Sequence, residues 1–425
     1  MWTNSAAQLA AALTARASRA AALLVAARLL GPAPFGTLAV ALAAYELLRV
    51  ASEAGLDTRL IRRVARSPAR GAVETVRTAR LKITLAAILI LAALGPVLLL
   101  LGSGDALLFA AIAAGAIGFA VSGSAQALAT GRLDAPRLLP LQAATGILFL
   151  VLVVTASAIW RAPLATATAI GLADLAAGWL LLRYVERSHV PGTMAGVWSW
   201  RAALREAWPV AGVNILATTY GRLGLAVLAF AWGSSAVAQY GVSARTVEVF
   251  LLASAAVAGS ALAVSSRLSA ESPEGSRALL DRLLAHPRSA ALTLGVAVLV
   301  AAAASLLPLV LGAGYAAAVP TTRVLAFALP PMFLNGLLTA HLYAEGRFHT
   351  VLRIAIVNLV LNAALVFWLV PRYGPIGAAC AVTATESANT LWQGRAIGFG
   401  WRSWPYAVAG VSLVAAGVGM LLALR

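Results

Sequence analysis

The chain has 425 residues, of which 61% are hydrophobic and 11% are charged. Soluble globular domains carry about 45–50% apolar and about 25% charged residues, so a soluble fold of this composition would expose far too much apolar surface. The composition excludes a large soluble enzyme. With one cysteine, Cys380, the chain also cannot form a disulfide scaffold. Residence in a membrane is therefore the first prediction.

The formal net charge of +17 raises the question of a nucleic-acid partner. Lys82 is the only lysine, and the arginines are dispersed between apolar segments rather than gathered into a basic domain that could follow phosphates along a duplex. The sequence therefore predicts no nucleic-acid binding. It also predicts no metal or cofactor, because four histidines lack ligand spacing: His189, His286, His341 and His349.

Apolar segments of about 20 residues, the length that one bilayer crossing requires, recur along the whole chain. They lie at 8–30, 35–54, 83–101, 106–128, 139–160, 164–183, 207–232, 236–265, 289–312, 319–344, 351–371, 375–394 and 405–423. The sequence thus predicts an all-α polytopic membrane protein with about thirteen transmembrane helices. Arg16 and Arg19 lie in the middle of the first segment, which argues against a cleaved signal peptide.

The connections between these segments fall into two classes. Those at 31–34, 102–105 and 233–235 are very short, whereas those near 55–82 and 184–206 are longer and rich in arginine. Basic residues accumulate in cytoplasmic loops, so we expect the longer connections and the N-terminus to be cytoplasmic. The chain contains no phosphate-binding G-x-x-x-x-G-K-[ST] loop, which excludes an ATP-driven pump built from this chain alone.

Two turns indicate an internal repeat. Residues 31–36 and 233–241 each form a glycine-flanked turn ending in aromatic-Gly, before a segment that carries an arginine and a glutamate. Duplicated bundles around a central cavity are a transporter architecture. We therefore predict two six-helix lobes around a central cavity, at 1–200 and 201–396, followed by an extra helix at 397–425.

Ionisable side chains lie inside several apolar segments, where each costs about 2.5–3.5 kcal/mol and tends to face protein or water. The basic ones are Arg16, Arg19, Arg49, Arg222 and Arg245, and the acidic ones are Glu46, Asp174, Glu248 and Glu386. Polar residues at helical spacing extend two of these positions into stripes: Asn214 and Thr218 before Arg222, and Thr390 and Gln393 after Glu386. These stripes predict a hydrated, arginine-lined cavity, which suits a phosphate-bearing anion.

The spacing leaves alternatives open for these charges. Arg49 either contacts substrate or pairs with Glu46 or Glu53, and Arg245 either contacts substrate or pairs with Glu248. The acidic residues are either ion-coupling carboxylates for H⁺ or Na⁺ or partners of the arginines. Arg16, Arg19 and Arg222 have no acid on their own segment, which favours substrate contact. We expect Asn358 and Asn362 to form interhelical hydrogen bonds.

Four motifs, in this order and spacing, resemble those of the bacterial polysaccharide flippases, which translocate O-antigen and exopolysaccharide units. They are ARLLGPAPFG at 27–36, GLDTRLIRR at 55–63, LGAGY at 311–315 and VPRYGPIGAA at 370–379. These flippases belong to the multidrug/oligosaccharidyl-lipid/polysaccharide exporter superfamily. Thirteen segments depart from the family's usual twelve or fourteen, so 405–423 either crosses the membrane or is a non-crossing helix.

The resemblance implies a secondary transporter of the bacterial inner membrane rather than an enzyme. It implies a cavity that opens alternately to each side, and undecaprenyl-pyrophosphate carrying an oligosaccharide as substrate. Polysaccharide polymerases and glycosyltransferases, together with membrane lipid, are the implied partners. Basic residues of the first, second, seventh and eighth spans would contact the pyrophosphate, here Arg16, Arg19, Arg49, Arg222 and Arg245.

Three rival functions differ in features that the sequence can display. A cation-coupled multidrug exporter of the same superfamily should have an acidic, arginine-poor cavity, and a peptidoglycan lipid-precursor flippase would differ mainly in the glycan. A membrane polysaccharide polymerase or glycosyltransferase is an enzyme of a different class. Such enzymes usually need a large external loop or clustered acids, and the chain has no D-x-D motif.

Overall fold

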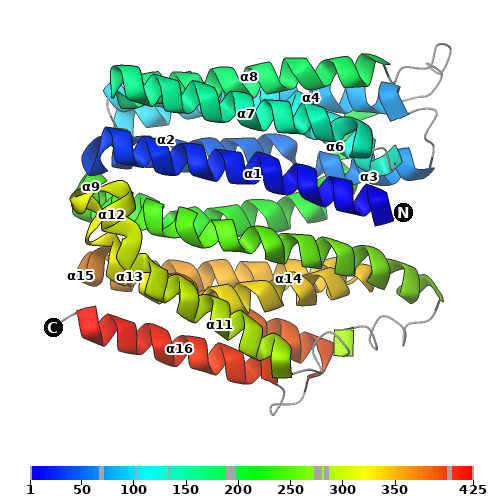
Figure 1. The fold of residues 1–425 in the computed structure, drawn as a ribbon. Helices are drawn as coiled ribbons and strands as arrows, with labels where there is room; N and C mark the ends of the chain where they lie inside the picture. Colours follow the sequence, from blue (N-terminus) through cyan, green and yellow to red (C-terminus); the bar gives the residue numbers. More distant parts are fainter. Residues whose placement is uncertain are drawn as a thin grey trace. The chain divides into compact units, whose positions relative to one another are not determined.

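The computed structural model is helical throughout the part of the chain that it describes (Figure 1). The structure describes residues 2–66, 71–101, 103–132, 135–187, 198–271, 280–281, 287–399 and 404–423. These ranges contain no β-strand. The predicted all-α fold is therefore confirmed.

The helices of the first half of the chain coincide with its six predicted spans. They are α1 Trp2–Leu30, α2 Pro32–Glu53, α3 Leu56–Arg66, α4 Gly71–Leu101, α5 Ser103–Ala113, α6 Gly115–Arg132, α7 Ala135–Trp160 and α8 Pro163–Arg187. The span predicted at 106–128 is divided between α5 and α6 at Ala114. Helix α3 was not predicted, because it lies in the polar connection at 55–82.

Helix α3 is amphipathic, and this explains why it forms inside a basic connection. Leu56, Leu60 and Val64 repeat every four residues and are fully buried, whereas Arg62 and Arg63 are exposed. An apolar stripe at this period needs a surface to cover, and α3 covers part of the core that α6 and α8 provide.

Two long helices dominate the second half of the chain. They belong to the set α9 Trp200–Glu271, α11 Pro287–Ala303, η2 Ala304–Leu306, α12 Leu307–Leu311, η3 Ala313–Tyr315, α13 Ala318–Ala326, α14 Leu329–Ala344, α15 Phe348–Ile397 and α16 Trp404–Ala423. Helix α9 breaks at Gly233 with φ 76°, and α15 breaks at Gly374 with φ 56°. Glycine adopts such values without steric cost, so each long helix contains two predicted spans joined by a glycine turn.

The two glycine breaks lie against one another. The Trp232 indole donates a hydrogen bond to the Val370 carbonyl oxygen at 2.9 Å, and its ring leaves only about a methyl-sized gap beside Gly374. A third break was not predicted. The span at 319–344 consists of α13 and α14, which meet at an angle of 41°.

The helices have the length and polarity of membrane spans. Within the described residues, seven are long and apolar enough to cross a bilayer, or eight if α13 and α14 form one span. Large apolar side chains that are mostly exposed, such as Leu91, Phe230 and Leu309, are suited to contact with lipid. The chain is therefore a multi-pass membrane protein.

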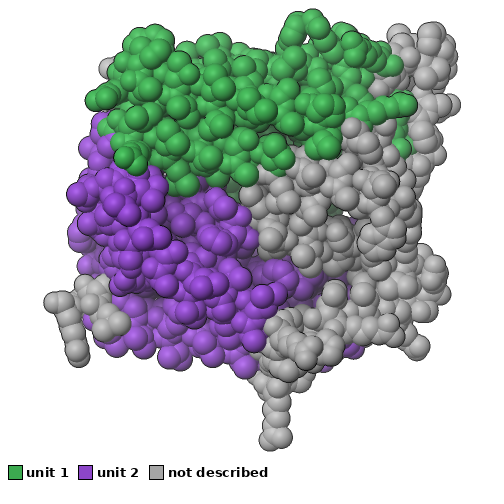
Figure 2. Space-filling view, viewed as in Figure 1, with its two compact units in different colours: residues 1–30, 37–218 green, residues 31–36, 219–425 purple. Residues whose placement is uncertain are grey.

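The chain divides into two compact helical units (Figure 2). Unit 1 comprises residues 1–30 and 37–218, and unit 2 comprises residues 31–36 and 219–425, so the division falls within α9. The lobe limits predicted at 1–200, 201–396 and 397–425 stay predictions.

The two turns that indicate an internal repeat are neighbours within unit 2. A β-carbon on Gly36 would collide with the backbone carbonyl of Ser234, so the start of α2 and the segment just after the break in α9 touch backbone to backbone. Only a glycine permits this approach.

Candidate functional site

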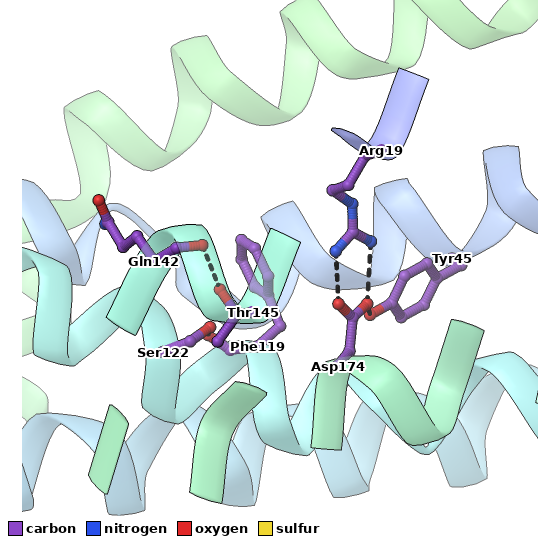
Figure 3. A network of polar contacts seen from close by, with 7 residues as sticks. All are labelled: Arg19, Tyr45, Phe119, Ser122, Gln142, Thr145 and Asp174. Carbon is purple, nitrogen blue, oxygen red and sulfur yellow. Dashed lines mark hydrogen bonds and ion pairs between the residues drawn. The ribbon is translucent and has the colours of Figure 1, made fainter. Parts of the chain in front are cut away.

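A buried charged group of unit 1 joins α1, α2 and α8 (Figure 3). Arg19 contacts both carboxylate oxygens of Asp174, with Nη2 to Oδ2 at 3.0 Å. The Tyr45 hydroxyl donates a hydrogen bond to the same Oδ2 at 2.6 Å. The side chain of Asp174 is 4% exposed and that of Arg19 is 30% exposed, so the carboxylate is enclosed while the guanidinium keeps an open side.

Glycines in α6 and α8 explain how Asp174 reaches this position. A β-carbon on Gly118 would collide with the Asp174 backbone carbonyl, and one on Gly178 would lie 2.6 Å from the Gly118 α-carbon. Gly115 leaves the room that the Asp174 side chain and the Tyr45 hydroxyl occupy. The two helices are therefore in near-backbone contact, as small residues allow between membrane helices.

Aromatic rings support the two described arginines of this site. The Arg19 guanidinium carbon lies 4.0 Å from the Phe149 ring centroid, and that of Arg49 lies 3.8 Å from the Phe119 ring centroid. The guanidinium of Arg49 makes no ion pair or hydrogen bond with any residue that the structure describes, and its Nε is buried. The predicted Arg49 bridges to Glu46 and Glu53 are thus not formed. A stacked guanidinium keeps its N–H edge available for an anion.

In unit 2, one carboxylate is shared by two arginines of α9. Arg222 Nη2 lies 3.3 Å from Glu248 Oε1, and Arg245 Nη1 lies 2.7 Å from Glu248 Oε2. The predicted Arg245–Glu248 pair is therefore present. Both arginine side chains are less than one-fifth exposed, and Glu248 is 36% exposed. These three residues together carry a net positive charge.

A buried carboxylate of unit 2, Glu386, is held by uncharged groups. Glu386 accepts hydrogen bonds from the Tyr220 hydroxyl and from Asn335 Nδ2, each at 2.7 Å. Asn335 Oδ1 in turn accepts a hydrogen bond from Thr390 at 2.9 Å. Glu386 is 4% exposed. Among the described residues, no arginine forms an ion pair with it.

The remaining candidate residues are held in local contacts. Thr218 bonds back to the Asn214 carbonyl at 2.8 Å, and Gln393 bonds to Asn389 at 2.8 Å. The side chain of Arg16 lies outside the part of the chain that the structure describes. No group of three or more His, Cys, Asp or Glu side chains in the described part of the chain could hold a metal ion.

Of the two asparagines of α15 that were expected to form interhelical hydrogen bonds, Asn362 forms one and Asn358 forms none with the described residues. Asn362 Nδ2 donates to Thr385 Oγ1 at 3.2 Å, which joins the two halves of the broken helix. The buried Oδ1 atoms of Asn358 and Asn362 have no hydrogen-bond partner among the described residues.

The aromatic residues of the site were not predicted from the sequence. Tyr45, Phe119 and Phe149 contact the charged groups, yet they lie on three different helices. Tyr45 gave one usable signal, because it directly precedes Glu46 in a charged turn of an apolar segment. The two phenylalanines gave none.

A model of the family described as "Polysaccharide biosynthesis protein" matches residues 2–263. The chain belongs to this family. The match covers unit 1 from residue 2 onward and extends through Arg222, Arg245 and Glu248, and it confirms the resemblance that the sequence motifs carry. Curated protein sequences give no match to this chain.

The solved structures that are similar to this chain are transporters. The eukaryotic MATE transporter AtDTX14 has a TM-score of 0.69 at 15% identity, with 97% of each chain covered. An inward-facing multidrug resistance MATE family transporter of the MOP superfamily has a TM-score of 0.70 at 14% identity, covering 96% of this chain and 93% of its own.

A MOP superfamily transporter from Pyrococcus furiosus, reported with a binding pocket of reverse polarity, has a TM-score of 0.58 at 14% identity, covering 99% of this chain and 98% of its own. At these identities the likeness of all three structures shows the fold alone. The chain therefore has the fold of these transporters.

Proposed function

We propose that this protein is a secondary transporter that flips undecaprenyl-pyrophosphate-linked oligosaccharide units across the bacterial inner membrane by alternating access. The units would serve O-antigen or exopolysaccharide synthesis, with glycosyltransferases supplying them and a polymerase consuming them. The family and the transporter fold support the proposal. The observation that carries it is the guanidinium of Arg49, which forms no ion pair with a carboxylate among the described residues although it lies on α2, a helix apolar enough to cross a membrane.

A guanidinium without a carboxylate partner is expensive at membrane depth unless an anion completes it. The Arg49 guanidinium carbon lies over the Phe119 ring, so this contact helps to position the cation before an anion arrives. Phosphate oxygens match the paired N–H groups of arginine, and such charge-assisted hydrogen bonds are about twice as strong as neutral ones. Arg49 is therefore the first proposed ligand of the pyrophosphate.

The other proposed ligands have different charge environments. Arg19 keeps an exposed side beside Asp174, and Arg222 and Arg245 both contact the carboxylate of Glu248. A neighbouring carboxylate weakens the attraction of an arginine for a dianion, which favours release of a transported substrate. Arg16 completes the proposed set on sequence grounds.

The energy for transport has two proposed sources. An inside-negative potential favours outward movement of an anion by about 2.3 kcal/mol per charge per 100 mV. A coupling cation, H⁺ or Na⁺, is proposed at Glu386, since this buried carboxylate is held by Tyr220 and Asn335 rather than by an arginine. Asp174, Glu46 and Glu248 are then charge partners of the basic residues.

The test replaces Arg49 in a strain that depends on this protein for surface polysaccharide. Arg49→Ala should lower export by about tenfold or more, because one hydrogen bond to a charged group contributes about 1.5–3 kcal/mol. Lipid-linked repeat units should accumulate on the inner leaflet. The matched control is Arg183→Ala, since Arg183 also stacks on an aromatic ring, Trp179, at 4.1 Å, but is exposed.

Unchanged export in Arg49→Ala, at normal protein abundance in the membrane, would contradict the assignment. Equal losses in Arg49→Ala and Arg183→Ala would show a general effect of removing a stacked arginine. A loss confined to Arg49→Ala is the expected result.

A second candidate, a cation-coupled multidrug exporter, is favoured by the structural likeness to a multidrug resistance MATE family transporter. The two candidates make opposite predictions for drug susceptibility. If the protein exports drugs, deleting it should sensitise cells to cationic compounds while polysaccharide stays intact. The flippase proposal expects loss of polysaccharide with unchanged susceptibility to these compounds.

A further inference from the structure

Exposed arginines gather where α3 meets the start of α9 in unit 1. We call the set Arg62, Arg63, Arg201 and Arg205 the α3/α9 arginine surface; all four are exposed. The proposed transport site does not use any of them. Both helix segments belong to the same unit, so their mutual arrangement is part of one packed body.

Tight packing fixes the two helix segments that carry this surface. Leu56 is fully buried in a small apolar cluster with Ala203 and Ala207. Gly55, with φ 67°, lies so close to α9 that a β-carbon there would be 2.7 Å from the Ala207 carbonyl oxygen and 2.9 Å from the Ala211 nitrogen. The arginines on α3 and α9 are therefore held at a constant spacing.

The nearby acids leave a positive excess on this surface. Glu206 Oε2 accepts from Arg59 Nε at 2.9 Å and from Arg63 Nη2 at 3.0 Å, and Glu74 lies 3.7 Å from Arg59 Nη1. These two carboxylates are thus engaged with Arg59 and Arg63. The other three arginines of the surface, Arg62, Arg201 and Arg205, form no ion pair with a carboxylate among the described residues.

Exposed tryptophans set the depth of this surface. Trp200 is 50% and Trp208 is 62% exposed, and the Arg201 guanidinium carbon lies 5.2 Å from the Trp200 ring centroid. Tryptophan collects at the level of lipid headgroups, and basic clusters on the cytoplasmic side attract anionic lipids. The sequence predicts that the connection ending at residue 206 is cytoplasmic.

From this combination we propose that the α3/α9 arginine surface binds the headgroups of anionic phospholipids. A helix end at headgroup depth meets lipid phosphates at high local density, and positive charge on a fixed frame selects those that carry a net negative charge. The partner is the surrounding bilayer itself. The proposal is independent of what the protein transports.

The test measures thermal unfolding of the purified full chain by tryptophan fluorescence while phosphatidylglycerol is added to a zwitterionic detergent. The wild type should gain stability in a saturable way, whereas phosphatidylcholine should have little effect. In R62Q/R205Q the phosphatidylglycerol concentration for half the effect should rise about 25-fold, about fivefold for each arginine removed. Both residues lack an ion-pair partner in the described structure, so the lipid-free melting temperature should stay unchanged.

The matched control is R161Q/R372Q, which removes the same charge from two exposed arginines. These arginines follow the fifth and the eleventh predicted span, so a cytoplasmic N-terminus places both on the opposite side of the membrane. This control should keep the wild-type response. An equal loss in both double variants would overturn the proposal in favour of general charge attraction. The proposal would also be overturned, in favour of a site for free anions, if sodium pyrophosphate stabilised the wild type and R62Q/R205Q lost this response as well. A wild type that phosphatidylglycerol does not stabilise would likewise refute it.

Discussion

Arg19 and Arg49 are both stacked on phenylalanine rings, yet their charges are balanced differently. Arg19 is matched by Asp174, which the Tyr45 hydroxyl also contacts, whereas Arg49 has no described carboxylate in contact. Removing the carboxylate from a half-buried ion pair leaves a cation whose charge is not balanced. Binding of an anion at Arg49 would instead balance the charge of a cation that has no carboxylate in contact. We therefore expect Arg49 to contribute more than Arg19 to the proposed binding of the pyrophosphate.

Asp174→Asn tests the balance at Arg19. The substitution keeps the size of the side chain but removes its charge, so the unfolding free energy should fall by about 2 kcal/mol, the contribution of hydrogen bonds to a charged group. The measurement is thermal unfolding of the purified protein in detergent. The Arg19→Gln/Asp174→Asn double variant should be less destabilised than the sum of the single variants, because the second change removes the unpaired charge. If the changes in unfolding free energy of the two single variants simply add up in the double variant, the Arg19–Asp174 pair does not contribute to stability.

At the level of elements, the contact between α6 and α8 depends on glycine. Gly118→Leu should destabilise the protein by at least the about 1–3 kcal/mol of ordinary overpacking, because the new side chain would collide with the Asp174 backbone rather than with a movable side chain. Thermal unfolding and the yield of monodisperse protein measure the effect. The matched control is Gly410→Leu on α16, where no atom lies within 4 Å of the added β-carbon. Similar losses in both variants would disprove the role of the close contact.

Apolar segment length predicted the helices well because a bilayer imposes one length on every crossing. Glycine turns at 233 and 374 also separated the predicted span pairs correctly. The interruptions at Ala114 and between α13 and α14 were missed. Helix α3 was missed as well. Pro330 and Pro331 in the first turn of α14 were a local signal for the second interruption, because proline suits the start of a helix better than its interior. Helix α3 was overlooked because its short apolar stripe lies among arginines.

At the level of the whole molecule, the sequence indicated which residues carry charge but not which of them meet. Arg19 and Asp174 are 155 positions apart, and no spacing rule connects them. The Arg245–Glu248 pair was readable because both residues lie on one helical turn. Glu248 also contacts Arg222 across the glycine break of α9, and this contact depends on how the chain turns there.

The predicted orientation in the membrane can be tested on a single helix of unit 2. His349 and Arg372 are both exposed and lie near the two ends of the first half of α15. At 1.5 Å per residue, the helix between them is long enough to cross a bilayer core of about 30 Å. A membrane-impermeant maleimide should therefore label Arg372→Cys in intact cells and label His349→Cys only after the cells are opened.

The native cysteine makes this experiment clean. Cys380 is 7% exposed and contacts the Ala416 carbonyl, so the unmodified protein should give no signal, and Cys380→Ala in both variants provides the matched background. The reverse labelling pattern would place the arginine-rich connections outside the cell. It would contradict the cytoplasmic N-terminus, and with it the outward direction in which the membrane potential assists an anionic substrate.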